Sequence, residues 1–202
     1  MDIDGIGDRY RRHSRMAEGF ARGKLRGDPV YAAVFPYLQA GSSVLDVGCG
    51  EGYLLALAAS VGCTELVGLD HDPRRMDQGR VALDDLGVRW LDGDVRQVEL
   101  PPADVVTCLD VLHYMPPEAQ DAVIQRLSAA VRPGGVLLLR DGRSDAGWRS
   151  TVTALSERVA MALGRHRGDG VFFRPAGALQ TSLEAAGLRV EICHGSEERV
   201  VF

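Results

Sequence analysis

Short apolar runs alternate along the chain with longer stretches of mixed polarity. Val and Leu fill most of the runs, and their apolar positions are largely continuous. Strands that are buried on both faces, as in a parallel sheet, have this pattern. It predicts seven strands, over residues 43–48, 65–70, 88–94, 103–110, 135–141, 188–193 and 199–202.

The mixed stretches between these runs have helical character and recognisable ends. Asp72 followed by Pro73 is a typical N-cap and first helical position. The sequence Arg132-Pro133-Gly134-Gly135 is typical of residues that follow a helix. The pattern predicts helices over residues 28–39, 51–61, 72–86, 116–131, 147–163 and 175–187.

The alternation of strands and helices predicts an α/β fold, a doubly wound sheet with right-handed crossovers. The length of 202 residues favours one domain with a full core, over residues 1–202. The connection 195–198 has only the length of a hairpin. One terminal strand is therefore expected to run antiparallel.

Composition narrows the classes of function. The net charge of −5 argues against general affinity for nucleic acid or anionic membranes. No apolar run approaches the roughly 18–20 residues of a membrane helix, and the N-terminus has no secretory pattern. The four cysteines are far apart, so we expect no metal site, no disulfide framework and a cytoplasmic location.

A glycine-rich turn follows the first predicted strand. The strand contains Asp46, and Gly48, Gly50 and Gly52 lead into the next helix. In doubly wound sheets, ligands bind beyond the carboxyl ends of the strands. Glycines allow a tight turn and close approach of a ligand, and a helix N-terminus presents N–H groups to it.

The spacing and the acids around this turn indicate the class of ligand. A dinucleotide site expects G-x-G-x-x-G, whereas here the third glycine comes one residue early. Asp46 would repel a pyrophosphate and suits a cationic portion of a ligand. Asp70, about 20 residues on, can accept from both hydroxyls of a ribose, and Asp94 can accept from an adenine amine. A nucleoside with a positive tail fits these acids. The alternative is ordinary turn chemistry and capping, and a nicotinamide-dependent enzyme stays open.

These motifs resemble the class I S-adenosylmethionine-dependent methyltransferases. The segments that carry the resemblance are VLDVGCGEG (44–52), GLDHDP (68–73), LDGDV (91–95), DVVTCLDVLHYMP (104–116) and LSAAVRPGGVLLLRDG (127–142). The resemblance implies a Rossmann-like seven-stranded sheet of order 3-2-1-4-5-7-6, with one antiparallel strand and helices on both faces. It also implies an N-terminal helical lid over residues 1–28 and a core over residues 29–202.

The resemblance implies a site for S-adenosylmethionine and its product S-adenosylhomocysteine. Asp70 would hold the ribose, and Asp94 with Val95 the adenine amine. His71 would flank the adenine, where family members more often have an apolar residue. The implied cofactor residues are Asp46, Gly48, Cys49, Gly50, Asp70, His71, Asp94, Val95 and, at the methionine portion, Leu109.

Methyl transfer is an in-line displacement, helped mainly by alignment, and it needs a base only when the acceptor must lose a proton. His113, after the fourth strand, is the candidate base. An ordinary loop or cap histidine is the alternative. Tyr10 and His13 in the lid segment, and Tyr114 and Arg174 elsewhere, are candidates for the acceptor side. A solvated basic helix and plain loop positions are their alternatives.

The acceptor is expected to be a small molecule. The end of the fourth strand reads CLDVLHY, which lacks the N/D/S-P-P-Y/F motif of amine methylases, and no surface of interleaved aromatic and basic residues suggests RNA. The N-terminal segment and GVFFRP (170–175) are similar to methyltransferases encoded beside bacterial aryl polyene and related polyketide-like pigment enzymes. This implies an aromatic or carrier-bound acceptor that is methylated on oxygen or carbon.

Charge along the N-terminal segment adds a possible partner. Seven cations lie between Arg9 and Arg26 against one acid, Glu18. Such a segment is suited to docking an acidic acyl carrier protein, an interaction that salt would weaken. Two other functions remain open, a nicotinamide-dependent oxidoreductase and a catalytically silent cofactor-binding partner subunit.

Overall fold

A computed structural model describes residues 1–142, 144, 169–191, 194–195 and 199–201. The chain divides into two compact units. The first is Met1–Thr107 with Val131–Val136, and the second is Cys108–Ala130 with the described residues from Leu137 onward. Two of the three boundaries fall inside strands, β4 and β5, and the third falls between α6 and β5. The single domain expected over residues 1–202 stays a prediction.

Strands and helices alternate as the sequence predicts. The strands are β1 (Ser43–Val47), β2 (Glu65–Asp70), β3 (Arg89–Asp92), β4 (Ala103–Leu109), β5 (Val131–Gly142), β6 (His194–Gly195) and β7 (Arg199–Val201). The described helices are α1 (Ile3–Tyr10), α2 (Arg15–Gly27), α3 (Val30–Val34), α4 (Tyr53–Ser60), α5 (Pro73–Ala82), α6 (Pro117–Ala130) and α8 (Ala176–Ala185), with short 3-10 turns at Phe35–Tyr37 and Leu112–Tyr114.

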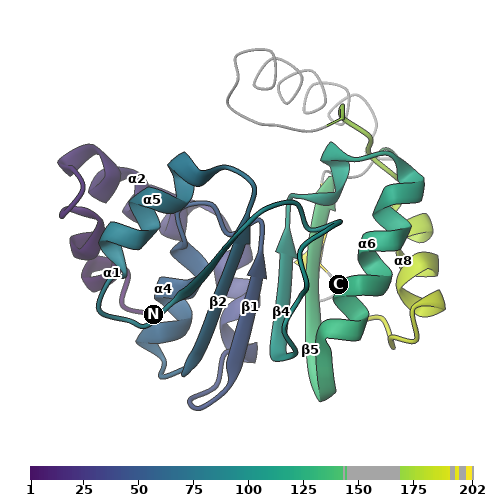
Figure 1. Cartoon of the computed structure of the whole chain (residues 1–202), viewed down its shortest axis with the longest axis horizontal. Helices are drawn as coiled ribbons and strands as arrows, with labels where there is room; N and C mark the ends of the chain where they lie inside the picture. Colours follow the sequence, from purple (N-terminus) through teal and green to yellow (C-terminus); the bar gives the residue numbers. More distant parts are fainter. Residues whose placement is uncertain (143, 145–168, 192–193, 196–198, 202) are drawn as a thin grey trace. The chain divides into compact units, whose positions relative to one another are not determined.

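Parallel pairing organises the strands of the first unit. β1 pairs with β2 and β2 with β3, in a register that places Asp46 opposite Gly68 and Asp70 opposite Asp92. β1 and β2 run side by side in the same direction in Figure 1. In the second unit, β7 pairs with both β5 and β6.

The core of the first unit explains its continuous apolar runs. Every residue of β1 is buried, and six of the eight residues of α4 are buried. A strand that is covered on both faces has no solvent side on which polar residues would alternate. Trp90 of β3 adds to this packing, because its ring fills the space beside Gly52, Gly68 and Gly79.

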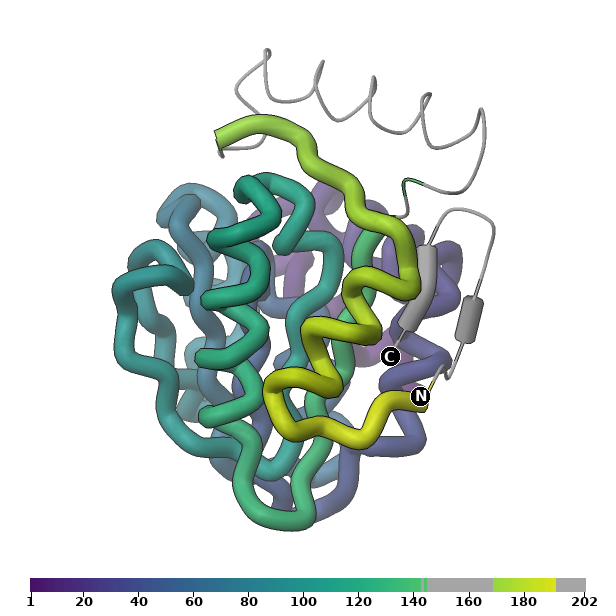
Figure 2. Tube along the Cα trace, turned by 90° about the vertical axis from the view of Figure 1, so that its right-hand side faces the viewer, coloured from purple at the N-terminus to yellow at the C-terminus, as the bar shows by residue number. Residues whose placement is uncertain are grey.

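In the second unit, α6 and α8 lie side by side (Figure 1, Figure 2). The Ser128 hydroxyl donates to the Ala186 carbonyl (2.9 Å). Gln120, which is buried, donates from its amide to the carbonyls of Met115 and Phe172 (both 2.9 Å). These contacts join α6 to the segment before α8.

Three expected elements differ from the structure or lie outside it. Residues 188–191 form no strand, and the short β6 comes later, at His194–Gly195. The helix expected over residues 28–39 is a short α3 followed by a 3-10 turn, because Pro36 cannot donate to a continuing helix. The helix expected over 147–163 lies outside the described residues. Among the described helices, none is long and apolar enough to cross a membrane.

The glycines of two helices provide a test of this packing. Gly79→Ala in α5 would place a Cβ 2.5 Å from the Trp90 ring and 2.7 Å from the Glu51 carbonyl oxygen. We expect it to destabilise the fold by about 1–3 kcal/mol in denaturant unfolding, despite the better helix propensity of alanine. The matched change Gly23→Ala in α2 meets nothing within 4 Å. It should stabilise by about 0.5–1 kcal/mol. Equal effects at both positions would contradict this description of the packing around Trp90.

Candidate functional site

The turn after β1 is built from glycines in left-handed conformations. Gly48, Gly50 and Gly52 have φ angles of 76°, 52° and 78°. The N–H groups of Gly48 and Cys49 both donate to the Leu69 carbonyl, at 2.7 and 3.1 Å. Residues with a Cβ rarely adopt these angles. The turn therefore bends back to the carboxyl end of β2, where Asp70 lies.

Asp70 connects the glycine turn to the start of α5. Its carboxylate is buried and accepts from the Gly50 N–H (2.8 Å) and the Asp72 N–H (2.9 Å), through a different oxygen in each bond. A carboxylate oxygen has a second lone pair, so each oxygen can accept one more hydrogen bond. This geometry suits a carboxylate that holds two neighbouring hydroxyls while it fixes the turn.

Asp46 lies in β1 below the turn and is buried. The Thr107 hydroxyl donates to it at 2.6 Å. Burial raises the pKa of Asp46 to about 7; the Thr107 hydrogen bond opposes this rise and the charge of Asp70 adds to it. A buried carboxylate that is costly to ionise is stabilised in its charged form by any nearby positive charge. This is consistent with the cationic ligand portion expected from the sequence.

Cys49 is a buried thiol in the same turn. Burial first, and then the charges of Asp46 and Asp70, raise its pKa well above the ordinary value. The thiol is therefore protonated at neutral pH. Its Sγ faces the Gly50 carbonyl at 3.9 Å.

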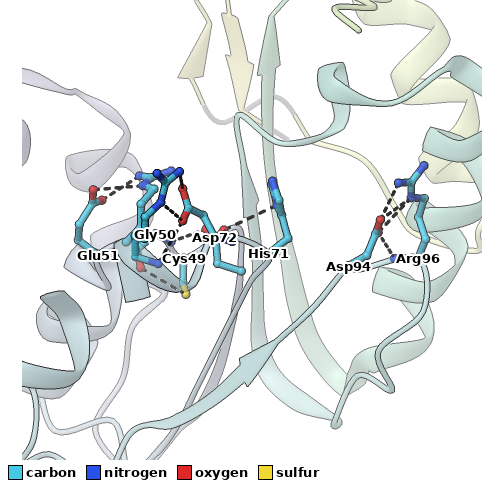
Figure 3. Close-up of polar contacts among 10 residues, drawn as sticks. Cys49, Gly50, Glu51, His71, Asp72, Asp94 and Arg96 are labelled. Atoms are coloured by element: carbon cyan, nitrogen blue, oxygen red, sulfur yellow. Dashed lines mark hydrogen bonds and ion pairs between the residues drawn. The ribbon is translucent and has the colours of Figure 1, made fainter. Parts of the chain in front are cut away.

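Asp94 follows β3 and is held by its own loop. The Arg96 guanidinium donates to Oδ2 at 2.6 and 2.9 Å and to Oδ1 at 3.0 Å, and the Arg96 backbone N–H donates to Oδ1 at 2.8 Å. Figure 3 shows the two side chains pointing toward each other. The Arg96 hydrogen bond lowers the pKa of Asp94. Val95 beside it is buried, and His71 is half exposed with Nδ1 3.7 Å from Asp70.

The sequence did not single out Arg75, which lies against the glycine turn. Its guanidinium forms a two-pronged ion pair with Glu51, at 2.8 and 3.1 Å. An ideal Cβ on Gly50 would lie only 2.7 Å from the Arg75 Cζ. The open face of Gly50 is thus covered by an arginine side chain. No local pattern in the sequence signals this position, because the partner Glu51 lies 24 residues away along the chain.

The N-terminal segment contacts the glycine turn through one buried side chain. The Tyr10 hydroxyl donates to the Glu51 carbonyl (2.8 Å), and its ring lies 4.8 Å from that of Tyr53. Burial raises its pKa well above the ordinary value. His13, in contrast, is exposed. Tyr10 is therefore a structural link between α1 and the turn, within the first unit.

Most cations of this segment are paired with acids. Arg9 and Arg12 pair with Asp85 and Asp84, beyond the end of α5. The remaining pairs lie within the segment, and they are Arg11–Glu18, Arg22–Asp4, Arg22–Asp8, Arg22–Glu18, Lys24–Asp28 and Arg26–Asp4. The charge run is thereby largely neutralised by acids that are distant in sequence or flank the run.

In the second unit, His113 and Asp141 form a buried pair. The Asp141 carboxylate accepts from the His113 backbone N–H (2.9 Å) and from the Gly142 N–H (2.7 Å), and it contacts His113 Nδ1. The Tyr114 and Phe173 rings lie 4.1 and 5.1 Å from the imidazole. An ionised carboxylate only accepts, so the proton is assigned to Nδ1 and Nε2 is the acceptor nitrogen. This arrangement suits a base.

The residues after β4 are held by β5. Asp110 has a left-handed φ of 59°. Its N–H donates to the Arg140 carbonyl (2.8 Å), and its carboxylate pairs with the Arg140 guanidinium. Leu109, predicted at the methionine portion, is half buried and ends the strand. Neighbouring residues of β5 thus fix both Asp110 and His113.

Arg174, a candidate for the acceptor side, contacts two helices of the second unit. Its guanidinium donates to Asp121 of α6 (2.6 Å) and to Ser182 of α8 (3.0 Å). It therefore ties two helices together. Tyr114 keeps its place beside His113, and its carbonyl accepts from the Asp169 N–H (2.9 Å).

Comparison with known proteins places this geometry in a family. A family model described as a methyltransferase domain matches residues 13–191. Carboxy-S-adenosyl-L-methionine synthase of Chromohalobacter salexigens is 37% identical over 112 residues, which cover 52% of this chain and 42% of that protein. The synthase of the same name from Aliivibrio fischeri is 29% identical over 155 residues, 69% of this chain and 63% of that protein. The chain thus spans less than two thirds of either relative.

Solved structures show the fold. An S-adenosylmethionine-dependent methyltransferase from Mesorhizobium loti superposes with a TM-score of 0.67 at 22% identity, over 83% of this chain and 84% of that one. The likeness shows an α/β Rossmann-like fold with a parallel sheet of five strands and helices.

The raised pKa of Asp46 predicts a pH-dependent stability. Asp46 becomes ionised near pH 4 in the unfolded chain but near pH 7 in the fold. Its contribution to stability is therefore complete below pH 4 and is lost as the pH rises toward 7. Asp46→Asn keeps an acceptor for Thr107 and has no charge.

Relative to the wild type, Asp46→Asn should gain stability between pH 5 and pH 8, on the order of 2–4 kcal/mol in urea unfolding. Other titrating groups cancel in this difference, because both proteins share them. A difference that stays constant across this range would show that Asp46 has an ordinary pKa.

Proposed function

The chain belongs to the methyltransferase-domain family, and from this membership we propose that it is an S-adenosylmethionine-dependent methyltransferase acting on a small-molecule acceptor. Bound S-adenosylmethionine supplies an electrophilic methyl group on a sulfonium. The chain's own residues bind and orient the reactants and take up a proton where the acceptor must lose one.

One observation carries the proposal, the hydrogen bond from the Gly50 N–H to the Asp70 carboxylate. It joins a turn of left-handed glycines to an acid whose oxygens can accept further hydrogen bonds. In our proposal Asp70 holds the ribose hydroxyls, and Gly48, Cys49 and Gly50 present their backbone to the ligand. Asp46 below them favours the cationic portion.

The adenine end is proposed at the loop after β3. Asp94 would accept from the adenine amine, beside the buried Val95 and the half-exposed His71. Arg96 holds the Asp94 carboxylate ionised and in a fixed orientation. Leu109, at the end of β4, is proposed for the methionine portion.

His113 is proposed as the base for an acceptor that must be deprotonated. The contact of Nδ1 with Asp141 selects the tautomer whose Nε2 can take a proton, and it stabilises the imidazolium that results. Asp141 is thus a positioning residue. Tyr114 and Phe173 flank the ring and favour an aromatic acceptor.

The acceptor is proposed to be an aromatic or polyketide-like molecule that is methylated on oxygen or carbon. A free acceptor is better supported than one delivered by an acidic carrier protein, because most cations of the N-terminal segment already pair with acids of this chain. The proposal includes the full seven-stranded sheet with its antiparallel strand, which the strand pairing supports.

A second candidate follows from the named relatives. Carboxy-S-adenosyl-L-methionine synthases are 29–37% identical to parts of this chain. In the candidate reaction a carbon of S-adenosylmethionine loses a proton and forms a bond to a carboxyl group, which a carboxylated co-substrate releases as carbon dioxide while it takes up that proton. Mass spectrometry of the nucleoside products separates the two, because methyl transfer yields S-adenosylhomocysteine and the second reaction yields a heavier S-adenosylmethionine.

Calorimetric titration of the purified protein tests the cofactor. We expect S-adenosylmethionine and S-adenosylhomocysteine to bind with micromolar Kd, and NADH to bind far more weakly. Asp70→Ala should raise the Kd for both nucleosides by about tenfold or more, since it removes the ribose acceptor and loosens the turn. Asp77→Ala, at an exposed acid of α5, should leave them unchanged. Tight binding of NADH alone would overturn the assignment in favour of an oxidoreductase.

The His113–Asp141 pair can be tested without knowing the acceptor. In nitrogen-15 NMR spectra of the imidazole, we expect His113 in the Nδ1–H form at pH 8. Asp141→Asn should weaken this preference, because an amide can also donate to Nδ1. An Nε2–H imidazole in the wild type would exclude His113 as the base in the orientation proposed.

A further inference from the structure

Arg75 is the feature of the first unit that the proposed function does not explain. It lies in the first turn of α5, five residues after Asp70, and its guanidinium contacts the bare Cα side of Gly50. The guanidinium of Arg75 therefore covers the side of Gly50 that the missing side chain leaves open.

The electrostatic surroundings of Arg75 are acidic. Glu51 holds two of its guanidinium nitrogens. Burial alone would lower the pKa of Arg75; the hydrogen bond and charge of Glu51, and then the charge of Asp70, raise it instead. The same acidic region attracts the cationic ligand in the proposed function. Arg75 and a positively charged ligand are therefore attracted by the same acidic side chains and repel each other.

We propose that Arg75 sets the selectivity of the site between the methyl donor and its product. This inference rests on the proposed function. S-adenosylmethionine carries a sulfonium charge that S-adenosylhomocysteine lacks. A fixed guanidinium against Gly50 therefore disfavours the donor and leaves the neutral thioether of the product almost unaffected. Glu51 limits this penalty by neutralising part of the guanidinium charge.

The experiment is calorimetric titration of three proteins with each nucleoside. Arg75→Met removes the charge and keeps an unbranched side chain. It should lower the Kd for S-adenosylmethionine by about three- to tenfold, as expected for the removal of a half-exposed charge. S-adenosylhomocysteine should change by less than about twofold. The ratio of the two Kd values is the decisive readout.

Arg74→Met is the matched control. Arg74 precedes Arg75 in the same turn, is more exposed, and pairs with Asp72 instead of Glu51. The control makes the same change in net charge and side-chain type. We expect its Kd ratio to stay within about twofold of the wild type, because Arg74 is not against the glycine turn.

A second variant covers the case in which Arg75→Met does not fold. Glu51→Gln keeps Arg75 and removes its neutralising partner, so the Kd ratio should move the opposite way, with the donor weakened more than the product. Thermal unfolding of each variant checks the fold.

Two results would overturn the inference and leave the proposed function standing. Arg75→Met could weaken both nucleosides equally, which would make Arg75 a direct ligand contact, or it could leave the ratio unchanged. Wild-type protein that binds neither nucleoside would instead contradict the proposed function, and this inference with it.

Discussion

The hydrogen bond between the Gly50 N–H and the Asp70 carboxylate is the constraint on which the first unit depends. It closes the turn after β1 against the end of β2, while the second oxygen of Asp70 starts α5 through the Asp72 N–H. One buried side chain thus fixes a strand end, a turn and a helix start. The two N–H groups satisfy one acceptor position on each oxygen of this buried carboxylate. The function proposed for this carboxylate uses only its remaining lone pairs.

In the second unit, β5 fixes two points of the chain in a similar way. Two adjacent residues, Arg140 and Asp141, hold the chain after β4 at two points, Asp110 and His113. Paired side chains of one strand have a fixed separation, so the backbone between the two points has little freedom. A general base needs a stable direction more than a large shift in pKa. Rigid support of this kind is what a proposed acceptor-side histidine requires.

Sequence reasoning predicted the elements that depend on local pattern. The continuous runs gave β1 to β5 within a few residues, and the glycines gave the left-handed turn. It misplaced the strand near residue 190, where the last strands are short and pairing decides their position. It missed Arg75, because its partner Glu51 is set by a tertiary contact. The charge run looked unbalanced for the same reason, since Asp84 and Asp85 lie far along the chain.

The protonated state of Asp46 has a consequence for how the protein meets a cation. Near pH 7 about half of the molecules carry a proton on this buried acid. A positively charged ligand near it favours the ionised form, so its arrival expels that proton to solvent. Binding is then an exchange of one positive charge for another. In the proposed function, acidification would therefore compete with a cationic ligand for this site.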